Sequence, residues 1–86
     1  MRRDEDYFGE CPLVLIYIAK RLADSLAVEK ILDGASVDYL VEVDYYVGGM
    51  IFRNERAGAF FYVEEAQQQY ARDLIRSSGY KPQEAD

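Results

Sequence analysis

The stretch that decides the fold is LVLIYIAKRLADSLAVEKILDGASVDYLVEVDYY, which runs from Leu13 to Tyr46. Its first part, Leu13–Ala19, is apolar on both alternating faces and rich in branched side chains, which is typical of a strand covered on both sides. Its last part, Ser36–Tyr46, alternates apolar and acidic residues, which is typical of a strand with one face in water. The middle part has helical spacing, so the stretch predicts a strand, a helix and a second strand.

The helix predicted over 22–35 carries two separate apolar faces. One stripe at helical spacing is expected to pack on a sheet; it consists of Val28, Ile31, Leu32 and Ala35. Leu22 and Leu26 lie on a different face, because successive helical residues are rotated by about 100°. We expect these two leucines to stay exposed once the helix has docked.

The rest of the chain predicts a third strand over 57–63 and a second helix over 64–79. The expected buried face of this helix is Tyr70, Ala71, Leu74 and Ile75, and Gly79 offers a C-terminal cap. A strand-helix-strand crossover makes its two strands parallel, so the third strand fits between them, antiparallel to both. The order strand, helix, strand, strand, helix therefore predicts an α+β, ferredoxin-like (split βαβ) fold with both helices on one face and the fourth strand missing.

Length and composition indicate one small domain. The chain has 86 residues, and we expect a flexible N-terminal segment over 1–11, a single domain over 12–79 and a polar tail over 80–86. A net charge of −6 argues against a basic surface of the kind that binds nucleic acid or an anionic membrane. Histidine is absent and Cys11 is the single cysteine, so the usual zinc ligand sets and an internal disulfide are excluded. We expect a cytoplasmic protein without cofactor, metal site or catalytic residues.

The sheet face away from the helices is predicted to be apolar. Leu40, one alternate set of the first strand, and either Phe60 with Tyr62 or Phe61 point to that side. So large an aromatic patch seldom stays in water on a small monomer. We therefore predict a homo-oligomer, a dimer or higher, with Leu40, Phe60 and Tyr62 at its interface. The alternative is that Tyr7 and Phe8 fold back over this face.

The stretch YYVGGMIFRNERAG, Tyr45 to Gly58, has two interpretations. A phosphate cradle needs backbone N–H groups at a helix N-terminus, and no helix-forming run follows Gly48 and Gly49. A long hairpin explains more, because the glycines permit a bend and RNERAG supplies a polar turn. The candidate residues for contacting a ligand or an acidic partner are Arg53, Asn54 and Arg56.

Two segments carry a family resemblance. IYIAKRLADSLAVEKILDGASV, Ile16 to Val37, resembles without a gap the start of the small bacterial domains called prokaryotic signal-transducing proteins. FFYVEEAQQQYARDLI, residues 60–75, resembles their second half, in which a strand ends in valine and a helix opens with acidic residues. Ser36 departs from the family pattern, which commonly has glycine there. The family is similar in fold to the PII signalling proteins, nucleotide-binding trimers whose long loop corresponds here to Tyr46–Ala57.

The sequence features above are compatible with three functions. The leading one is a small non-catalytic regulatory or protein-interaction module that works as an oligomer. The alternative, which the resemblance implies, is a PII-like nucleotide sensor; Arg53 or Arg56 would then contact the ligand. The second alternative is a metal-dependent enzyme, for which Asp38, Glu42 and Asp44 stand at alternate strand positions. Such a row is typical of a solvated strand face, and oxygen ligands on a flat surface bind metal weakly.

Overall fold

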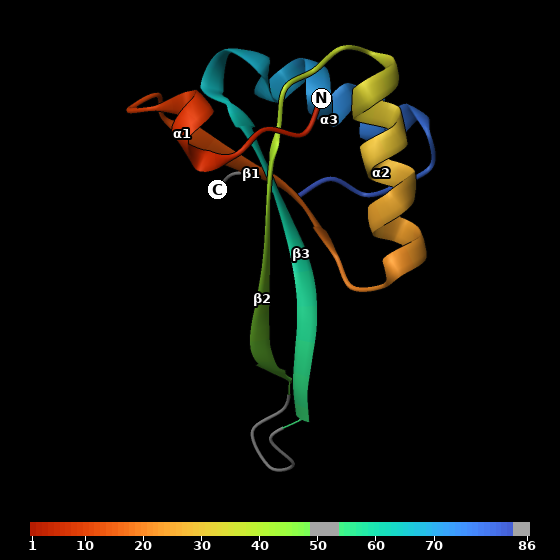
Figure 1. Ribbon diagram of the computed structural model, residues 1–86. Coiled ribbons are helices and arrows are strands. Elements are labelled where there is room, and N and C mark those ends of the chain that lie inside the picture. Colours follow the sequence, from red (N-terminus) through yellow and green to blue (C-terminus); the bar gives the residue numbers. More distant parts are fainter. Residues whose placement is uncertain (49–53, 84–86) are drawn as a thin grey trace.

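The computed structural model describes residues 1–48 and 54–83 and shows a three-stranded antiparallel sheet with two longer helices packed on one of its faces (Figure 1). The element order gives an α+β fold. In chain order the elements are α1 Glu5–Phe8, β1 Leu13–Ala19, α2 Leu22–Gly34, β2 Leu40–Gly48, β3 Asn54–Glu64, a 3-10 turn Glu65–Gln67 and α3 Gln68–Ser77. In the described ranges, no helix is long and apolar enough to cross a membrane.

The sheet has the strand order β1-β3-β2, and β3 runs antiparallel to both neighbours. β1 and β2 are therefore parallel to each other, and α2 connects them. A bulge interrupts β1, because Leu15 lies opposite Tyr62 while Tyr17 lies opposite the preceding residue, Phe61. Ile16 is the extra residue, and its side chain is fully buried in the core.

The core fills the space between the sheet and the helices α2 and α3. Its fully buried side chains come from both layers and are Ile16, Val28, Leu32, Tyr39, Phe61, Val63, Ala71 and Ile75. The predicted stripe of α2 is confirmed, since Ile31 and Ala35 are half-buried beside its two buried members. Leu22 and Leu26 are exposed, with 75% and 56% of their surface accessible, as expected.

The buried face of α3 differs from the prediction at two positions. Tyr70 is exposed, whereas Arg72 is buried, with 5% of its surface accessible. The buried and half-buried residues of this helix include Gln68, Ala71, Arg72 and Ile75, a standard helical stripe. The prediction missed the stripe because two of these four positions are polar.

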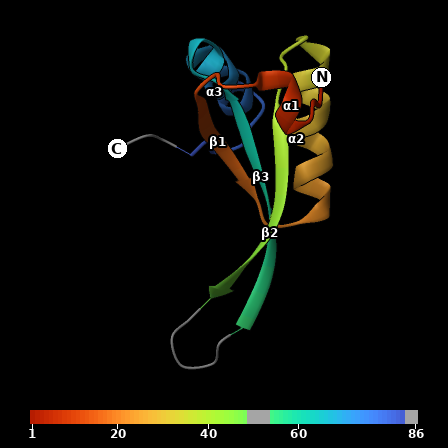
Figure 2. The same ribbon diagram turned by 60° about the vertical axis from the view of Figure 1, so that its left-hand side comes forward.

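The hairpin predicted over 45–58 is present in its two arms. β2 and β3 pair continuously from Leu40 opposite Tyr62 to Gly48 opposite Asn54. β1 ends at Ala19, opposite Ala59, so the hairpin continues as a two-stranded ribbon beyond the rest of the sheet (Figure 2). The predicted polar turn is wrong for residues 54–58, which belong to β3, because backbone pairing does not depend on their polar side chains. Residues 49–53, including Met50–Phe52 and Arg53, lie outside the described residues.

Both ends of the described chain pack on the sheet. At the N-terminus, predicted above as flexible, Arg2 pairs with Tyr39 in a parallel bridge, and Arg3 N–H donates to the Tyr39 carbonyl at 2.8 Å. At the C-terminus, predicted as a tail, Gln83 N–H donates to the Ile16 carbonyl at 2.7 Å. The sheet edges at the start of β2 and at the middle of β1 are thus covered by segments assigned to neither strand.

Candidate functional site

The face of the sheet opposite α2 and α3, which we call the outer face, carries two rows of side chains from all three strands. Residues directly opposite one another share a face. One row is Leu15, Tyr62 and Leu40, and the next is Ile18, Phe60 and Glu42. The three predicted interface residues, Leu40, Phe60 and Tyr62, are thus brought together on this face, while Phe61 points into the core.

The helix α1 covers part of the outer face. The side chain of Phe8 is buried, with 3% of its surface accessible, and it lines a hollow of about 280 Å³ together with outer-face residues. The full lining is Glu5, Phe8, Gly9, Leu13, Leu40, Glu42 and Tyr62. Phe8 therefore folds back over the outer face, as the alternative prediction has it, whereas Tyr7 is half exposed.

Because α1 covers part of the outer face, the three predicted interface residues differ in how exposed their side chains are within the single chain. Leu40 is buried, with 8% of its surface accessible. Phe60 and Tyr62 are half-buried, and Phe60 does not line the hollow under α1. Ile18, opposite Phe60, is half-buried too. The part of the outer face that stays accessible is therefore centred on Phe60 and Ile18.

Asp38 fastens α1 in place. Its Oδ1 accepts the Nε–H of Arg3 at 3.0 Å, and its Oδ2 accepts the hydroxyl hydrogen of Tyr7 at 2.9 Å. The Arg3 guanidinium also lies 4.4 Å from the centroid of the Tyr7 ring. The hydrogen bond from Arg3 holds the pKa of the Asp38 carboxyl below its ordinary value. The bond to Asp38 likewise raises the pKa of the Tyr7 phenol.

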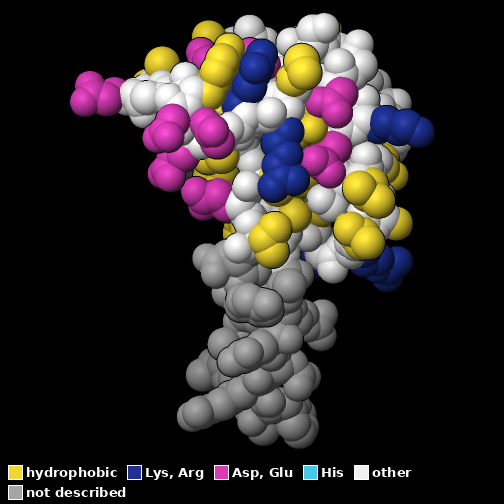
Figure 3. Space-filling model, in the orientation of Figure 1, with side chains coloured by type: hydrophobic (Ala, Val, Ile, Leu, Met, Phe, Trp, Pro, Cys, Tyr) yellow, Lys and Arg dark blue, Asp and Glu magenta, His cyan; other side chains and the backbone are white. Residues whose placement is uncertain are grey.

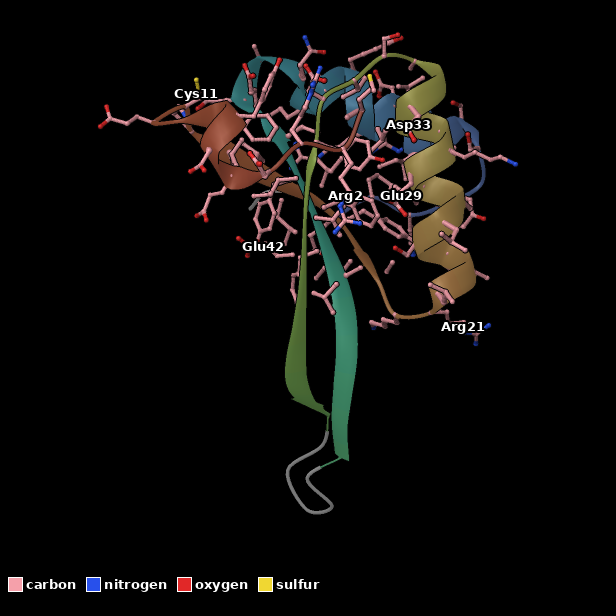
Figure 4. The ribbon with its side chains drawn as sticks, viewed as in Figure 1. Arg2, Cys11, Arg21, Glu29, Asp33 and Glu42 are labelled. Carbon is pink, nitrogen blue, oxygen red and sulfur yellow. The ribbon has the colours of Figure 1, made fainter. Side chains whose placement is uncertain are left out.

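A second polar set joins the N-terminal segment to α2. Tyr39 is fully buried, and its O–H donates to Asp33 Oδ1 at 3.0 Å. Burial is the main cause that raises the pKa of Tyr39, and the bond to Asp33 adds to it. Arg2 lies 3.6 Å from a carboxylate oxygen of Glu29, and Figure 4 shows Arg2 directed from the N-terminal segment toward α2.

Arg72 is a buried cation that sequence reasoning missed. Its guanidinium donates to three neutral acceptors: the Gln83 carbonyl at 3.0 Å, Gln68 Oε1 at 2.8 Å and the Leu15 carbonyl at 3.3 Å. These bonds tie α3, β1 and the segment after α3 together. The available signal was the spacing of Gln68, Ala71, Arg72 and Ile75, because a polar residue inside a helical core stripe indicates a buried partner.

Two of the three predicted ligand-binding residues, Asn54 and Arg56, lie at the other end of the molecule. Arg53 is outside the described residues. The backbones of Asn54 and Arg56 belong to β3, opposite Gly48 and Tyr46, in the two-stranded part of the ribbon. This places them away from α1, and the structure does not bring them together with the outer-face rows.

Of the carboxylates considered as metal ligands, Asp38 and Glu42 have described side chains, whereas the side chain of Asp44 lies outside the described part of the structure. Asp38 is turned toward Arg3 and Tyr7, and Glu42 is an exposed residue beside the hollow under α1. Within residues 1–48 and 54–83, no group of three or more acidic, cysteine or histidine residues is placed to hold a metal ion. The thiol of Cys11 is free and exposed, at the turn that follows α1.

Comparisons with protein-family models, with curated proteins and with solved structures found no match. The resemblance to the prokaryotic signal-transducing domains therefore stays a prediction from the sequence. Three structural features bear on function: the outer face of the sheet, the helix α1 that partly covers it, and the two-stranded ribbon of β2 and β3.

Proposed function

We propose that the protein is a small non-catalytic regulatory or protein-interaction module that works as a homo-oligomer and uses the outer face of its sheet as a contact surface. The observation that carries this proposal is the accessible row of Ile18 and Phe60. These are large apolar side chains on neighbouring strands, and they are half-buried on a face that α1 covers elsewhere. Contiguous apolar patches of this kind mark interaction sites on soluble proteins.

The size of the chain supports self-association. A domain of 86 residues buries a smaller fraction of its surface than a larger one, so an additional apolar interface adds a large share to its stability. One layer of helices covers the inner face of the sheet, and a third layer on the outer face is a known, though less common, architecture. A second copy of the chain, packed on Phe60 and Ile18, provides that layer.

The topology supports a finer proposal about the fold. β1, α2 and β2 form a strand-helix-strand unit with parallel strands, and β3 lies between these strands. This arrangement is compatible with a ferredoxin-like, split βαβ fold that lacks the fourth strand. We propose on this basis, and on the resemblance of residues 16–37 and 60–75, that the chain belongs with the small prokaryotic signal-transducing domains.

The experiment that tests the contact surface is the solution mass of matched variants, measured by light scattering after size exclusion. Phe60→Lys places a charge in the middle of the accessible row, and we expect it to reduce the mass to that of the monomer. Ile18→Lys tests the same row from the neighbouring strand. Leu26→Lys is the control, because Leu26 is 56% exposed on α2, away from the outer face. Circular dichroism confirms that each variant is folded.

Two results would speak against the contact surface. An oligomer that persists in both Phe60→Lys and Ile18→Lys would show that the copies meet elsewhere. Dissociation by Leu26→Lys alone would move the interface to the exposed leucines of α2. Leu40 is unsuitable for this test, since it is buried within the single chain and a charge there would destabilise the fold itself.

A PII-like nucleotide sensor is the second candidate, and the length of the ribbon supports it. The pairing of β2 with β3 continues for five residue pairs beyond Val43 and Ala59, down to Gly48 and Asn54. A long hairpin in this place is what the PII resemblance implies for a target-contacting loop. Thermal melts with a panel of nucleotides test it, because a ligand present at 100 times its Kd adds about 2.7 kcal/mol to stability.

A further inference from the structure

The hollow between α1 and the outer face combines an apolar floor with an acidic rim. Its floor is formed by Phe8, Leu13, Leu40 and Tyr62, which come from α1 and from all three strands. Glu5 on α1 and Glu42 on β2 also line the hollow, together with Gly9. Figure 4 shows Glu42 beneath α1, on the side of β2 away from α2.

The volume of the hollow limits what it can hold. At about 280 Å³ it is slightly smaller than most ligand pockets, which usually enclose about 300 to 1,000 Å³. This is room for one or two side chains and not for a nucleotide with its phosphates. Two carboxylates at the rim also repel anions. The hollow therefore fits an elongated apolar group that ends in a positive charge.

The two rim carboxylates are available for a partner. Both Glu5 and Glu42 are exposed, and among the described residues neither lies in an ion pair. The nearby arginines are already engaged, because Arg3 is bonded to Asp38 and Arg2 is paired with Glu29. Figure 3 shows Asp and Glu side chains gathered around α1, with Lys or Arg side chains beside them on the same face.

We propose that this hollow binds a lysine or arginine side chain from a basic segment of a partner protein. The aliphatic stem of such a side chain packs on Phe8, Leu13 and Leu40, while its cation lies between Glu5 and Glu42. Long basic side chains are built in this way, with an apolar stem and a charged end. The surrounding carboxylates guide a basic segment to the hollow by long-range attraction.

A second copy of this chain is the less suitable occupant. Each copy carries a net charge of −6, so the acidic rim of the hollow repels another copy.

The inference rests on the proposed function, since it names the class of partner for one part of the outer face. It uses the hollow under α1, whereas the proposed contact between copies uses Phe60 and Ile18.

The test is a fluorescence anisotropy titration of the whole chain with a short labelled peptide of alternating lysine and leucine. The same peptide with glutamate in place of lysine is the second probe. The variant Glu5→Gln with Glu42→Gln keeps the shape of the rim and removes its charge. The control, Glu65→Gln with Asp73→Asn, changes the net charge equally on the exposed side of the segment from 65 to 77.

We expect the wild type to bind the lysine peptide and not the glutamate peptide. Loss of both rim charges should weaken binding about tenfold, because two partly exposed ion pairs are lost. The control pair should weaken it by less than about twofold. If Glu5→Gln impairs α1, Glu42→Gln alone provides the comparison, since it lies on a strand and should weaken binding about threefold.

Three results would overturn the proposal: no binding to the wild type, equal weakening by the rim pair and the control pair, or unchanged binding in both. A fall in solution mass of the rim variant with unchanged peptide binding would instead assign the hollow to a second copy. The Phe60→Lys mass measurement is independent of these outcomes. A failure there, with rim-dependent peptide binding intact, would remove the contact between copies and leave the hollow as a binding site.

Discussion

The guanidinium of Arg3 donates its Nε–H to Asp38 at 3.0 Å, although the two residues are 35 positions apart in the chain. Asp38 also accepts the hydroxyl hydrogen of Tyr7, the residue before Phe8. The N-terminal segment is thereby joined to the start of β2, and Phe8 is held over Leu40 and Tyr62. The contact between Arg3 and Asp38 therefore helps to hold α1 over the outer face, and α1 limits the part of this face that a partner can reach.

This relationship predicts a pH dependence. Arg3 holds the pKa of Asp38 below its ordinary value of 3.8, so the ionised carboxylate stabilises the fold at neutral pH. The stabilisation is lost as the pH falls below about 4 and through the folded pKa. Asp38→Asn should lower the free energy of unfolding by a small amount at neutral pH, because the pair is partly exposed and screened.

Urea denaturation of wild type and Asp38→Asn at several pH values checks this expectation. The gap between the two proteins should be constant from about pH 7 to pH 5 and should shrink below about pH 4. A gap that keeps its size at about pH 3 would show that the ionised state of Asp38 does not matter. The comparison cancels the titration of the other carboxylates, which both proteins share.

Phe8 should contribute to stability in spite of its place near the chain end. Its side chain is 3% exposed, so Phe8→Ala should lower the free energy of unfolding by about 3 kcal/mol, as for other buried phenylalanines. Leu26→Ala, at an exposed position of α2, should change it by less than about 0.5 kcal/mol. Equal effects of the two substitutions in urea denaturation would show that α1 does not cover the outer face in solution.

Much of the fold was predictable because the deciding signals are local. β1 occupies the predicted range, since its apolar run is bounded by Pro12 and Lys20. α2 begins at the predicted Leu22 and ends one residue early, at Gly34. The predicted exposure of Leu22 and Leu26 also followed from helical spacing alone.

The features that the prediction missed depend on contacts distant in sequence. α1 has four residues, too few to show a period, and besides the Asp4 cap it is held by Asp38. β3 begins at Asn54 because the backbone pairs with Gly48, not because its polar side chains favour a strand. The hollow under α1 needed the position of Phe8 relative to Leu40, which no local pattern contains.

Arg72 should fix the segment after α3 to β1. Arg72→Leu leaves the Leu15 and Gln83 carbonyls without their side-chain donor, so we expect a loss of about 1 to 3 kcal/mol. The amide of Gln83, which donates to Ile16, should then exchange its hydrogen faster in NMR experiments. Arg76→Gln on the exposed side of the same helix should leave that exchange rate unchanged. Unchanged protection of Gln83 in Arg72→Leu would contradict the assigned role.

Ser36 offers a stabilising substitution. Its φ of 57° lies in the left-handed region that favours glycine, the residue common at this place in the resembled family. Ser36→Gly should raise the free energy of unfolding by about 0.5 to 1 kcal/mol. Ala35→Gly, at a φ of −97°, should lower it by a similar amount. A loss of stability in Ser36→Gly would mean that the turn does not hold this conformation in solution.

The most direct test of the outer face as a contact surface is the solution mass of the wild-type chain over a range of protein concentrations. One chain has a mass of 9.9 kDa. Light scattering should give a multiple of this value, two copies or more, that persists on moderate dilution. A mass of 9.9 kDa at every concentration would show that the row of Ile18 and Phe60 does not bind a second copy.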